Sequence, residues 1–155
     1  MQLKQGCSGM WIAAAAAILD QITKAAVRAG ASFRLDGVFA VRYTENTGAA
    51  FSMFSGSGLA LTLITALMIA GLTCWLIARP VSLSKWSRVG LWLIVGGGLG
   101  NLYDRIVYGA VTDFIQLLFV HFAVFNVADI AICAGAFIAA VAMYIDEKRK
   151  ESAHE

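Results

Sequence analysis

The sequence predicts an all-α membrane protein with four transmembrane helices and a small extracytoplasmic β element between the first two. Three observations support this fold class. The 155 residues are 59% hydrophobic and only 14% charged, whereas soluble domains are about half apolar and a quarter charged. The chain has one proline and a mean hydropathy of +0.73. Its apolar residues also gather in segments of roughly 20 residues, the length that a helix needs to cross a bilayer core.

The predicted spans follow from these apolar segments, which lie at about 10–29, 59–78, 86–106 and 123–145. The first carries Asp20, Lys24 and Arg28 in its second half, and the second carries no charge. The apolar stretch 114–145 is too long for one perpendicular helix, so the fourth span is assigned to its second part. No linker is long enough to separate soluble domains, and residues 1–155 are therefore expected to form a single integral-membrane domain.

Lysine and arginine residues indicate the orientation of these spans. An even number of spans places both termini on one side, and the loops and tails of that side contain Lys4, Arg79, Lys85, Arg88, Lys148, Arg149 and Lys150. The other side has mainly Arg34 and Arg42, so the positive-inside rule predicts cytoplasmic termini. Alternatively, Met1 to about Ala17 is a cleaved signal peptide, which would remove the first span. The net charge of +2 is scattered, which argues against nucleic-acid binding.

The segment at about 33–55, between the first two spans, differs from them in pattern. Apolar Phe39, Val41 and Tyr43 recur at every second position, with polar Arg42 and Thr44 on the alternate positions, and 46–48 provides turn residues. A period near two indicates a strand or hairpin. This extracytoplasmic segment is the one β element that the sequence predicts.

Four carboxylates are expected to gather at one depth in the membrane. At about 1.5 Å per helical residue, Asp104 falls roughly 28 Å and Asp129 roughly 25 Å from the inner border of the core. Asp20 lies at a similar level, and Asp113 lies in the short outer connection between the third and fourth spans. Ionisable residues at such depth cost about 2.5 to 3.5 kcal/mol each and are therefore usually paired or functional.

Helical spacing places polar residues on shared faces: Asn101 with Asp104 and Arg105, Asn126 with Asp129, and Asp20 with Lys24. The Asp20–Lys24 and Asp104–Arg105 combinations are interpreted either as neutralising pairs between helices or as parts of a site. Asp113 and Asp129 have no sequence-adjacent cation. Two unpaired carboxylates at one depth predict a proton-sharing dyad, in which one group acts as acid and the other as base. Such a dyad can activate water against a peptide carbonyl without a metal or a covalent intermediate.

Other chemistries are poorly supported by the sequence. It contains neither HExxH, GxSxG nor GxxxxGK[ST]. Its three cysteines lie far apart without partner histidines, so no metal site, disulfide framework or cofactor is predicted. Gly96 and Gly100 are interpreted as positions of close helix packing, and His121 is a lone interfacial histidine.

Five blocks occur in order over almost the whole chain: DQITK at 20–24, ENTGAAF at 45–51, GGGLGNLYDR at 96–105, VTDF at 111–114 and FNVAD at 125–129. With them the chain resembles lipoprotein signal peptidase, the type II signal peptidase of bacteria. The resemblance implies an intramembrane aspartyl endopeptidase of the bacterial cytoplasmic (inner) membrane. Such an enzyme cleaves lipoprotein precursors before a diacylglyceryl-modified cysteine, and the resemblance implies that Asp113 and Asp129 are the catalytic dyad.

The resemblance also implies roles for further residues. Asn46 and Gly48 fall in the family's substrate-facing segment. Asn101, Asp104, Arg105 and Asn126 would orient the dyad and bind the substrate backbone, and Asp20 and Lys24 would brace the site. The implied partners are diacylglyceryl-modified precursors and membrane lipids, and the chain is expected to act as a monomer, without a cofactor, with its site facing the outer leaflet. One departure is that the connection from Asp113 to Asn126 is short and lacks the proline often seen before the FN block.

Two other functions remain open at this point. A small proton-coupled transporter or channel subunit would also contain buried Asp and Arg, but it predicts carboxylates spread through the membrane depth, preferably across repeats. A non-catalytic assembly factor would not require both Asp113 and Asp129.

Overall fold

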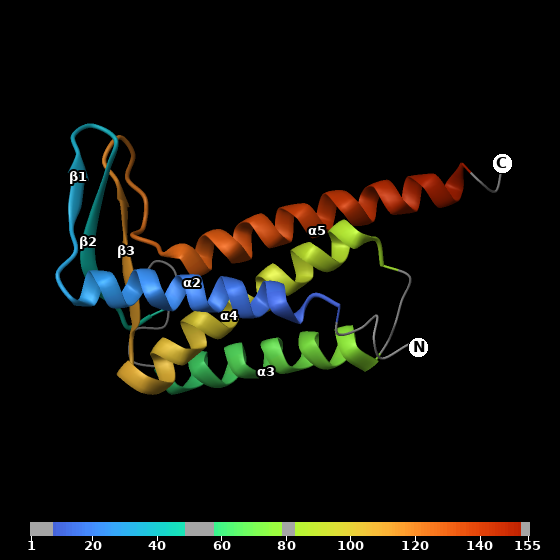
Figure 1. Cartoon of the computed structure of the whole chain (residues 1–155), viewed down its shortest axis with the longest axis horizontal. Helices are drawn as coiled ribbons and strands as arrows, with labels where there is room; N and C mark the ends of the chain where they lie inside the picture. The colour runs from blue at the N-terminus through green and yellow to red at the C-terminus, as the bar shows by residue number, and fades with distance from the viewer. Residues whose placement is uncertain (1–7, 49–57, 79–82, 153–155) are drawn as a thin grey trace.

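The computed structural model describes residues 8–48, 58–78 and 83–152. Its elements are α2 (Met10–Arg28), β1 (Phe33–Leu35), β2 (Phe39–Asn46), α3 (Gly58–Ala78), α4 (Lys85–Tyr108), β3 (Val111–Leu117) and α5 (Val127–Glu151). The helices extend in one general direction, and the three strands stand at one end of them (Figure 1). The start of α2 and the end of α5 lie at the opposite end.

Three of the described helices are long and apolar enough to cross a membrane, namely α2, α3 and α5. The first two match the predicted spans at 10–29 and 59–78 closely. The helix α5 begins at Val127, four residues later than predicted, because Asn126 is its N-cap. The Asn126 side chain accepts a hydrogen bond from the Asp129 N–H, and the Asp129 carboxylate accepts one from the Asn126 N–H. This reciprocal arrangement, a capping box, fixes where the helix starts.

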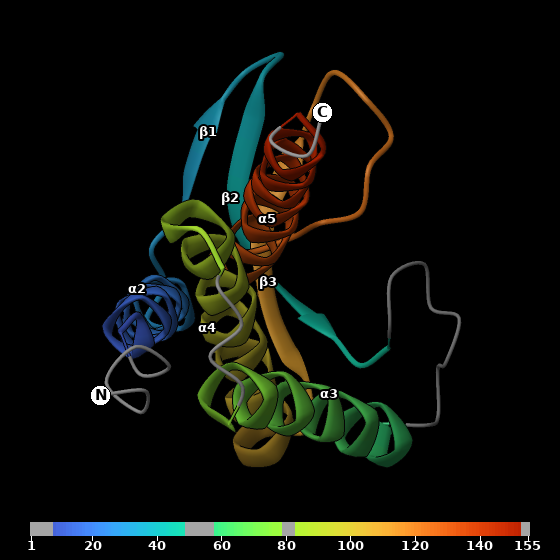
Figure 2. The same ribbon diagram turned by 90° about the vertical axis from the view of Figure 1, so that its right-hand side faces the viewer.

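The third predicted span corresponds to α4, which is 24 residues long but is not among the helices that qualify by apolar composition. It lies between α2 and α5 (Figure 2) and buries much of its surface, including Asn101 and Asp104. The third predicted span is therefore present as a helix but is less apolar than the other three. Because neighbouring helices and strands cover the polar residues of α4, this helix does not need the composition of a lipid-facing span.

Glycines allow α4 to approach its neighbours closely, as predicted for Gly96 and Gly100. A Cβ atom at Gly96 would overlap the backbone of Ala13 on α2, and one at Gly100 would overlap the Asp20 carboxylate. On the side that faces α5, a Cβ at Gly97 would overlap the carbonyl oxygen of Ala128, in the first turn of that helix. Close packing through small residues is the usual way in which membrane helices associate.

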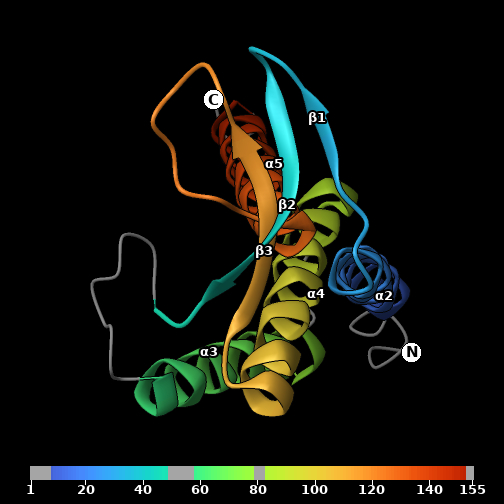
Figure 3. The same ribbon diagram turned by 90° about the vertical axis from the view of Figure 1, so that its left-hand side faces the viewer.

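The strands form one antiparallel sheet with the order β1-β2-β3. The expectation of a single β element, between the first two spans, was wrong because β3 lies in the connection that precedes α5. The chain reverses between β1 and β2 at residues 36–38, where Gly37 has a φ of 76°; the 46–48 turn instead ends β2. Residues 49–55 of the predicted β segment lie outside the described residues. Figure 3 shows β2 and β3 side by side at the helix ends.

Candidate active site

The two candidate catalytic carboxylates come from different elements that meet where the sheet joins the helices. Asp113 lies on β3, opposite Thr44 of β2, and Asp129 lies in the first turn of α5. Among the described residues, neither carboxylate forms an ion pair within 4 Å. Their hydrogen bonds come from amide groups instead.

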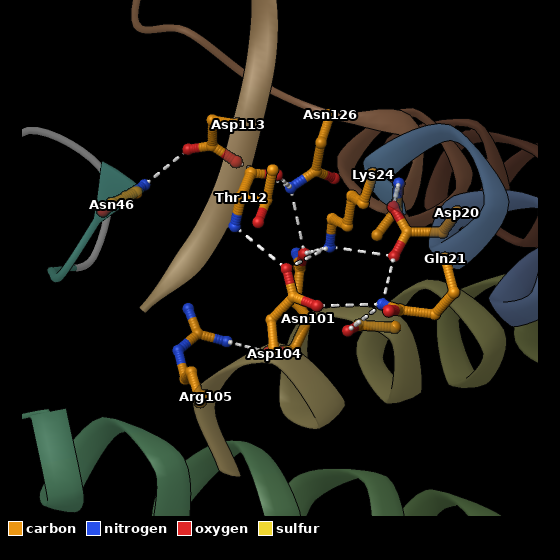
Figure 4. A network of polar contacts seen from close by, with 12 residues as sticks. Asp20, Gln21, Lys24, Asn46, Asn101, Asp104, Arg105, Thr112, Asp113 and Asn126 are labelled. Carbon is orange, nitrogen blue, oxygen red and sulfur yellow. Dashed lines mark hydrogen bonds and ion pairs between the residues drawn. The ribbon is translucent and has the colours of Figure 1, made fainter. Parts of the chain in front are cut away.

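Two asparagine side chains connect the carboxylates to each other. Asn126 Nδ2 donates to Asp113 Oδ1 at 2.6 Å, and the Asn126 backbone N–H donates to Asp129 Oδ2 at 3.1 Å. Asn101 Nδ2 donates to Asp129 Oδ1 at 2.9 Å. Asn126 Nδ2 also lies 3.0 Å from Asn101 Oδ1. The two carboxylates and the two asparagines therefore form one continuous hydrogen-bonded unit; Figure 4 shows the part of it that contains Asp113, Asn126 and Asn101.

A buried charged cluster lies directly behind this unit. Lys24 Nζ is 2.8 Å from Asp20 Oδ2, 3.3 Å from Asp104 Oδ2 and 2.8 Å from Asn101 Oδ1, and the side chains of Lys24, Asp20 and Asp104 have no exposed surface. The Asp20 carboxylate accepts the Ala128 N–H at 2.9 Å. Lys24 and Asp20 both lie on α2. The contacts of Lys24 with Asp104 and Asn101 join this helix to α4, and the contact of Asp20 with Ala128 joins it to α5.

Asp104 extends the cluster to the sheet. Its Oδ2 accepts the Thr112 N–H at 2.9 Å, and Thr112 is the residue before Asp113. Arg28 Nη1 donates to Thr112 Oγ1 at 2.9 Å and lies 3.5 Å from Asp104 Oδ1. The backbone that carries Asp113 is thus held by contacts from both α2 and α4.

Burial changes the acidity of Asp113, which is 2% exposed. Desolvation, strengthened by the nearby charge of Asp129, raises the pKa of Asp113 to about 6, although hydrogen bonds from Asn46 and Asn126 oppose this rise. Asp129 is only half-buried. The two carboxylates therefore lie in different environments, which is the condition for dividing the acid and base roles between them.

The end of β2 contacts the dyad as well. Asn46 Nδ2 donates to Asp113 Oδ2 at 2.8 Å, and the Gly48 N–H donates to Asn46 Oδ1 at 3.1 Å. The second bond fixes the orientation of the Asn46 amide, so that its NH2 group faces the carboxylate. Of the two residues that the resemblance assigned to the substrate-facing segment, Asn46 contacts Asp113 directly and Gly48 supports Asn46.

The structure brings together nine of the ten predicted site residues in this hydrogen-bonded network, and the tenth, Arg105, behaves differently. Of the two interpretations of Asp104 and Arg105, a neutralising pair is not the one found among the described residues, because the cations within 4 Å of the Asp104 carboxylate are Lys24 and Arg28. Arg105 Nη1 donates to the carbonyl oxygen of Asn101 in its own helix at 3.4 Å. Its half-buried guanidinium remains close enough to the dyad to interact electrostatically with both carboxylates.

Three participating residues were missed by the sequence analysis: Gln21, Arg28 and Thr112. Gln21 Nε2 donates to Asp20 Oδ2 at 3.2 Å, to the Gly100 carbonyl at 3.1 Å and to Asp104 Oδ1 at 3.0 Å. Gln21 lies within the DQITK block and Arg28 follows Lys24 by four residues on α2, and that helical spacing was the signal available for Arg28. No set of three or more His, Cys, Asp or Glu residues in the described part of the chain is arranged to hold a metal ion.

Comparisons with known proteins find a family model and relatives that match most of the chain. A family model described as signal peptidase (SPase) II matches residues 12–145. The lipoprotein signal peptidase of Thermosynechococcus vestitus is 39% identical over 133 residues, which cover 81% of this chain and 84% of the relative. That of Pseudomonas aeruginosa is 37% identical over 157 residues, which cover 94% of this chain and 92% of the relative.

A solved structure described as a bacterial membrane enzyme has a similar fold. It superposes with a TM-score of 0.81 at 29% identity and covers 92% of this chain and 91% of its own. These likenesses give no support to the transporter or channel alternative.

Proposed function

The chain belongs to the signal peptidase II family, a family of aspartic proteases that remove signal peptides from lipoprotein precursors, and we propose that Asp113 and Asp129 perform this cleavage. The observation that carries the proposal is that Asn126 donates hydrogen bonds to both carboxylates. Asn126 thereby positions two carboxylates from different elements relative to each other, and catalysis by paired carboxylates depends on this relative position.

The raised pKa of Asp113 supports a division of roles. Asp113, whose pKa is about 6, is the group that holds the shared proton, and Asp129 is the base. Asp129 takes a proton from water while the water oxygen attacks the scissile carbonyl carbon and Asp113 gives its proton to the carbonyl oxygen. As the tetrahedral intermediate collapses, Asp129 returns its proton to the leaving nitrogen and Asp113 recovers one from the hydroxyl. The C–N bond breaks to give a carboxyl and an amine.

Lys24 keeps the amide of Asn101 in the productive orientation. Asn101 Oδ1 faces two donors, Lys24 Nζ at 2.8 Å and Asn126 Nδ2 at 3.0 Å. An amide oxygen accepts and an amide nitrogen donates, so these two contacts direct Asn101 Nδ2 toward Asp129. Asp20 and Asp104 neutralise Lys24 and hold it at this place.

Substrate contacts are assigned to groups at the edge of the dyad. Among the described residues, the hydrogen bond of the Arg105 side chain is a long one to its own helix, which leaves guanidinium N–H groups for carbonyl oxygens of the precursor backbone. Asn46 and Gly48, at the end of β2, border Asp113 from the opposite side. The cleaved bond precedes a cysteine whose diacylglyceryl group lies in the outer leaflet, and this anchor holds the bond at the level of the carboxylates.

The proposed setting is the bacterial cytoplasmic (inner) membrane, where the chain works as a monomer and a single domain. The end that carries the sheet faces the outer leaflet and both termini are cytoplasmic. Basic residues support this orientation, because Lys148, Arg149 and Lys150 all lie in the last turn of α5, at the end far from the sheet.

The test is cleavage of a lipidated precursor by the purified protein in bilayers. Asp113→Asn and Asp129→Asn should each reduce the rate by about 10² to 10⁴, the usual contribution of a positioned acid or base. Asp36→Asn is the matched control, because Asp36 lies exposed in the β1–β2 turn. Near-normal turnover in either dyad variant would contradict the proposed roles.

A further inference from the structure

A groove with a volume of about 630 Å³ lies between α2 and α4. Its walls extend from Ala17 to Ala25 on α2 and from Leu99 to Ile106 on α4 and are mostly apolar. Leu99, Tyr103 and Ile106 follow the i, i+4, i+7 spacing of one helical face, whereas Asn101 and Asp104 belong to the opposite face of α4. The groove is therefore separate from the dyad and lies behind it.

The depth of the groove matches one leaflet of a bilayer. The 19 residues of α2 extend over roughly 28 Å at 1.5 Å per residue, which is close to the thickness of the hydrocarbon core. The stretch from Ala17 to Ala25 covers about 12 Å of this length, toward the end that carries the sheet. An acyl chain from one leaflet fits this extent. A helix that crosses the membrane would need a groove that continues along all of α2.

Polar and aromatic groups mark the sheet-side end of the groove. Tyr103 lines it, and the ring centroid of Tyr108 lies 6.3 Å from that of Tyr103. Arg28 Cζ lies 4.4 Å from the Tyr108 centroid, and the Arg28 side chain is 21% exposed. Tyrosine side chains are enriched at the level of lipid headgroups, and a guanidinium is well suited to a phosphate because its N–H groups form a planar fork. This end of the groove offers the chemistry that a phospholipid headgroup requires.

We propose that the groove binds one acyl chain of a bilayer phospholipid whose phosphate lies beside Arg28 and Tyr108. The identity of the leaflet, the outer one, rests on the orientation given under the proposed function; binding itself does not. Gln21 gives the site a link to the enzyme, because it lines the groove and donates to Asp20 and Asp104. The bound chain excludes water from the Gln21 amide and so favours these hydrogen bonds over competing ones.

Photolabelling of the full chain in vesicles tests this proposal without using peptidase activity. The probe is phosphatidylglycerol with a diazirine in one acyl chain, diluted into phosphatidylcholine. Adducts should concentrate in peptides that contain residues 17–25 and 99–106, relative to α3. Ala25→Trp places an indole in the groove and should lower the adduct yield there by about tenfold, a loss of roughly 1.4 kcal/mol in binding. Ala26→Trp is the matched control, because Ala26 is also exposed on α2 but does not line the groove.

The labelling results distinguish between the possible occupants of the groove. Equal labelling of all lipid-facing surfaces, or an equal effect of the two tryptophan variants, would show only annular lipid and overturn the proposal. Loss of the adducts on addition of unlabelled lipidated precursor would assign the groove to the substrate's own chain and also overturn it. Concentrated labelling in a protein that fails to cleave precursor would support the lipid site and contradict the proposed peptidase residues instead.

Discussion

Replacement of Lys24 by methionine separates the two effects of the buried charged cluster, stability and positioning. The change keeps a long unbranched side chain but removes the charge that lies 2.8 Å from Asp20 and 3.3 Å from Asp104. It also removes the donor 2.8 Å from Asn101 Oδ1. We expect Lys24→Met to lower both the thermal stability and the turnover number.

The expected loss of stability follows from burial. All three side chains of the Lys24–Asp20–Asp104 cluster are fully buried, and Arg28, the remaining cation, lies at 3.5 Å from Asp104. Removing one partner of a buried ion pair typically costs about 3 to 5 kcal/mol because it leaves an uncompensated charge. A second replacement, Asp20→Asn, restores charge balance in the cluster. The double variant should therefore regain much of the stability that Lys24→Met loses.

The loss of activity has a different cause and should not recover. Without Lys24, the Asn101 side-chain oxygen keeps one of its two donors, Asn126 Nδ2, so the orientation of the amide is less firmly fixed. A rotated amide would turn its oxygen toward Asp129, and a misplacement of about 1 Å at a reacting group can reduce the rate by about 10². We expect kcat to fall by about this factor in both the single and the double variant, with a smaller change in KM.

Two measurements on each protein suffice, the melting temperature in detergent and the cleavage kinetics of a lipidated precursor. Arg34→Met is a suitable control, since Arg34 pairs only with exposed Asp36 among the described residues, and surface ion pairs contribute about 0 to 1 kcal/mol. If the double variant recovered activity together with stability, Lys24 would act only through folding. Unchanged kcat in Lys24→Met would refute the positioning argument altogether.

Four further predictions concern Asp113, the packing of α4 and the orientation of the chain. The pKa of Asp113 rises from its ordinary 3.8 to about 6 on folding, so the native state binds this proton more tightly. The free energy of unfolding should therefore fall by roughly 2 kcal/mol as pH increases from about 4 to 6; denaturant titrations should show this slope in the wild type and lose it in Asp113→Asn. For the same reason kcat/KM should decline above about pH 6, as the proposed acid loses its proton; a profile that rises through that range would contradict the assignment. Gly100→Ala should lower the melting temperature, because the added Cβ would overlap Asp20. Gly71→Ala, at a position where no atom lies within 4 Å of the added Cβ, should be neutral or should stabilise the protein by up to about 1 kcal/mol. Equal effects of the two variants would argue against tight packing of α2 on α4. In a variant that lacks all three native cysteines, Asp36→Cys should react with a membrane-impermeant thiol reagent in intact cells and Lys150→Cys only after lysis; the reverse pattern would invert the proposed topology.

Local spacing singled out the carboxylates of the candidate site, whereas Asn46 and Gly48 came from the family resemblance. Apolar segment length located α2 and α3, since a helix in lipid must satisfy its backbone internally and exclude charge over a fixed distance. The same constraint made Asp20, Asp104 and Asp129 conspicuous, because few carboxylates are tolerated at that depth. Their convergence with Asp113 in one network agrees with the depth argument.

Pairing across long sequence separations could not be predicted in this way. The strand β3 pairs with β2, and Asp113 lies opposite Thr44, yet its first four residues are all buried and show no alternation. A strand that is covered on both faces has no period-two pattern to detect. The sequence therefore indicated a loop where the structure has the strand that carries one member of the dyad.

The sequence by itself determined which ionisable residues carry a free-energy cost in a membrane, and these residues were therefore the candidates for a site. Tertiary structure decided which of them are partners. Helical spacing allowed a pair of Asp104 with Arg105 as one of two interpretations, but Asp104 binds Lys24 and the backbone of Thr112. The reason is physical: helical spacing restricts which side chains share a face, whereas a buried charge takes the partners that packing brings within hydrogen-bond distance, and here those partners come from α2 and β3.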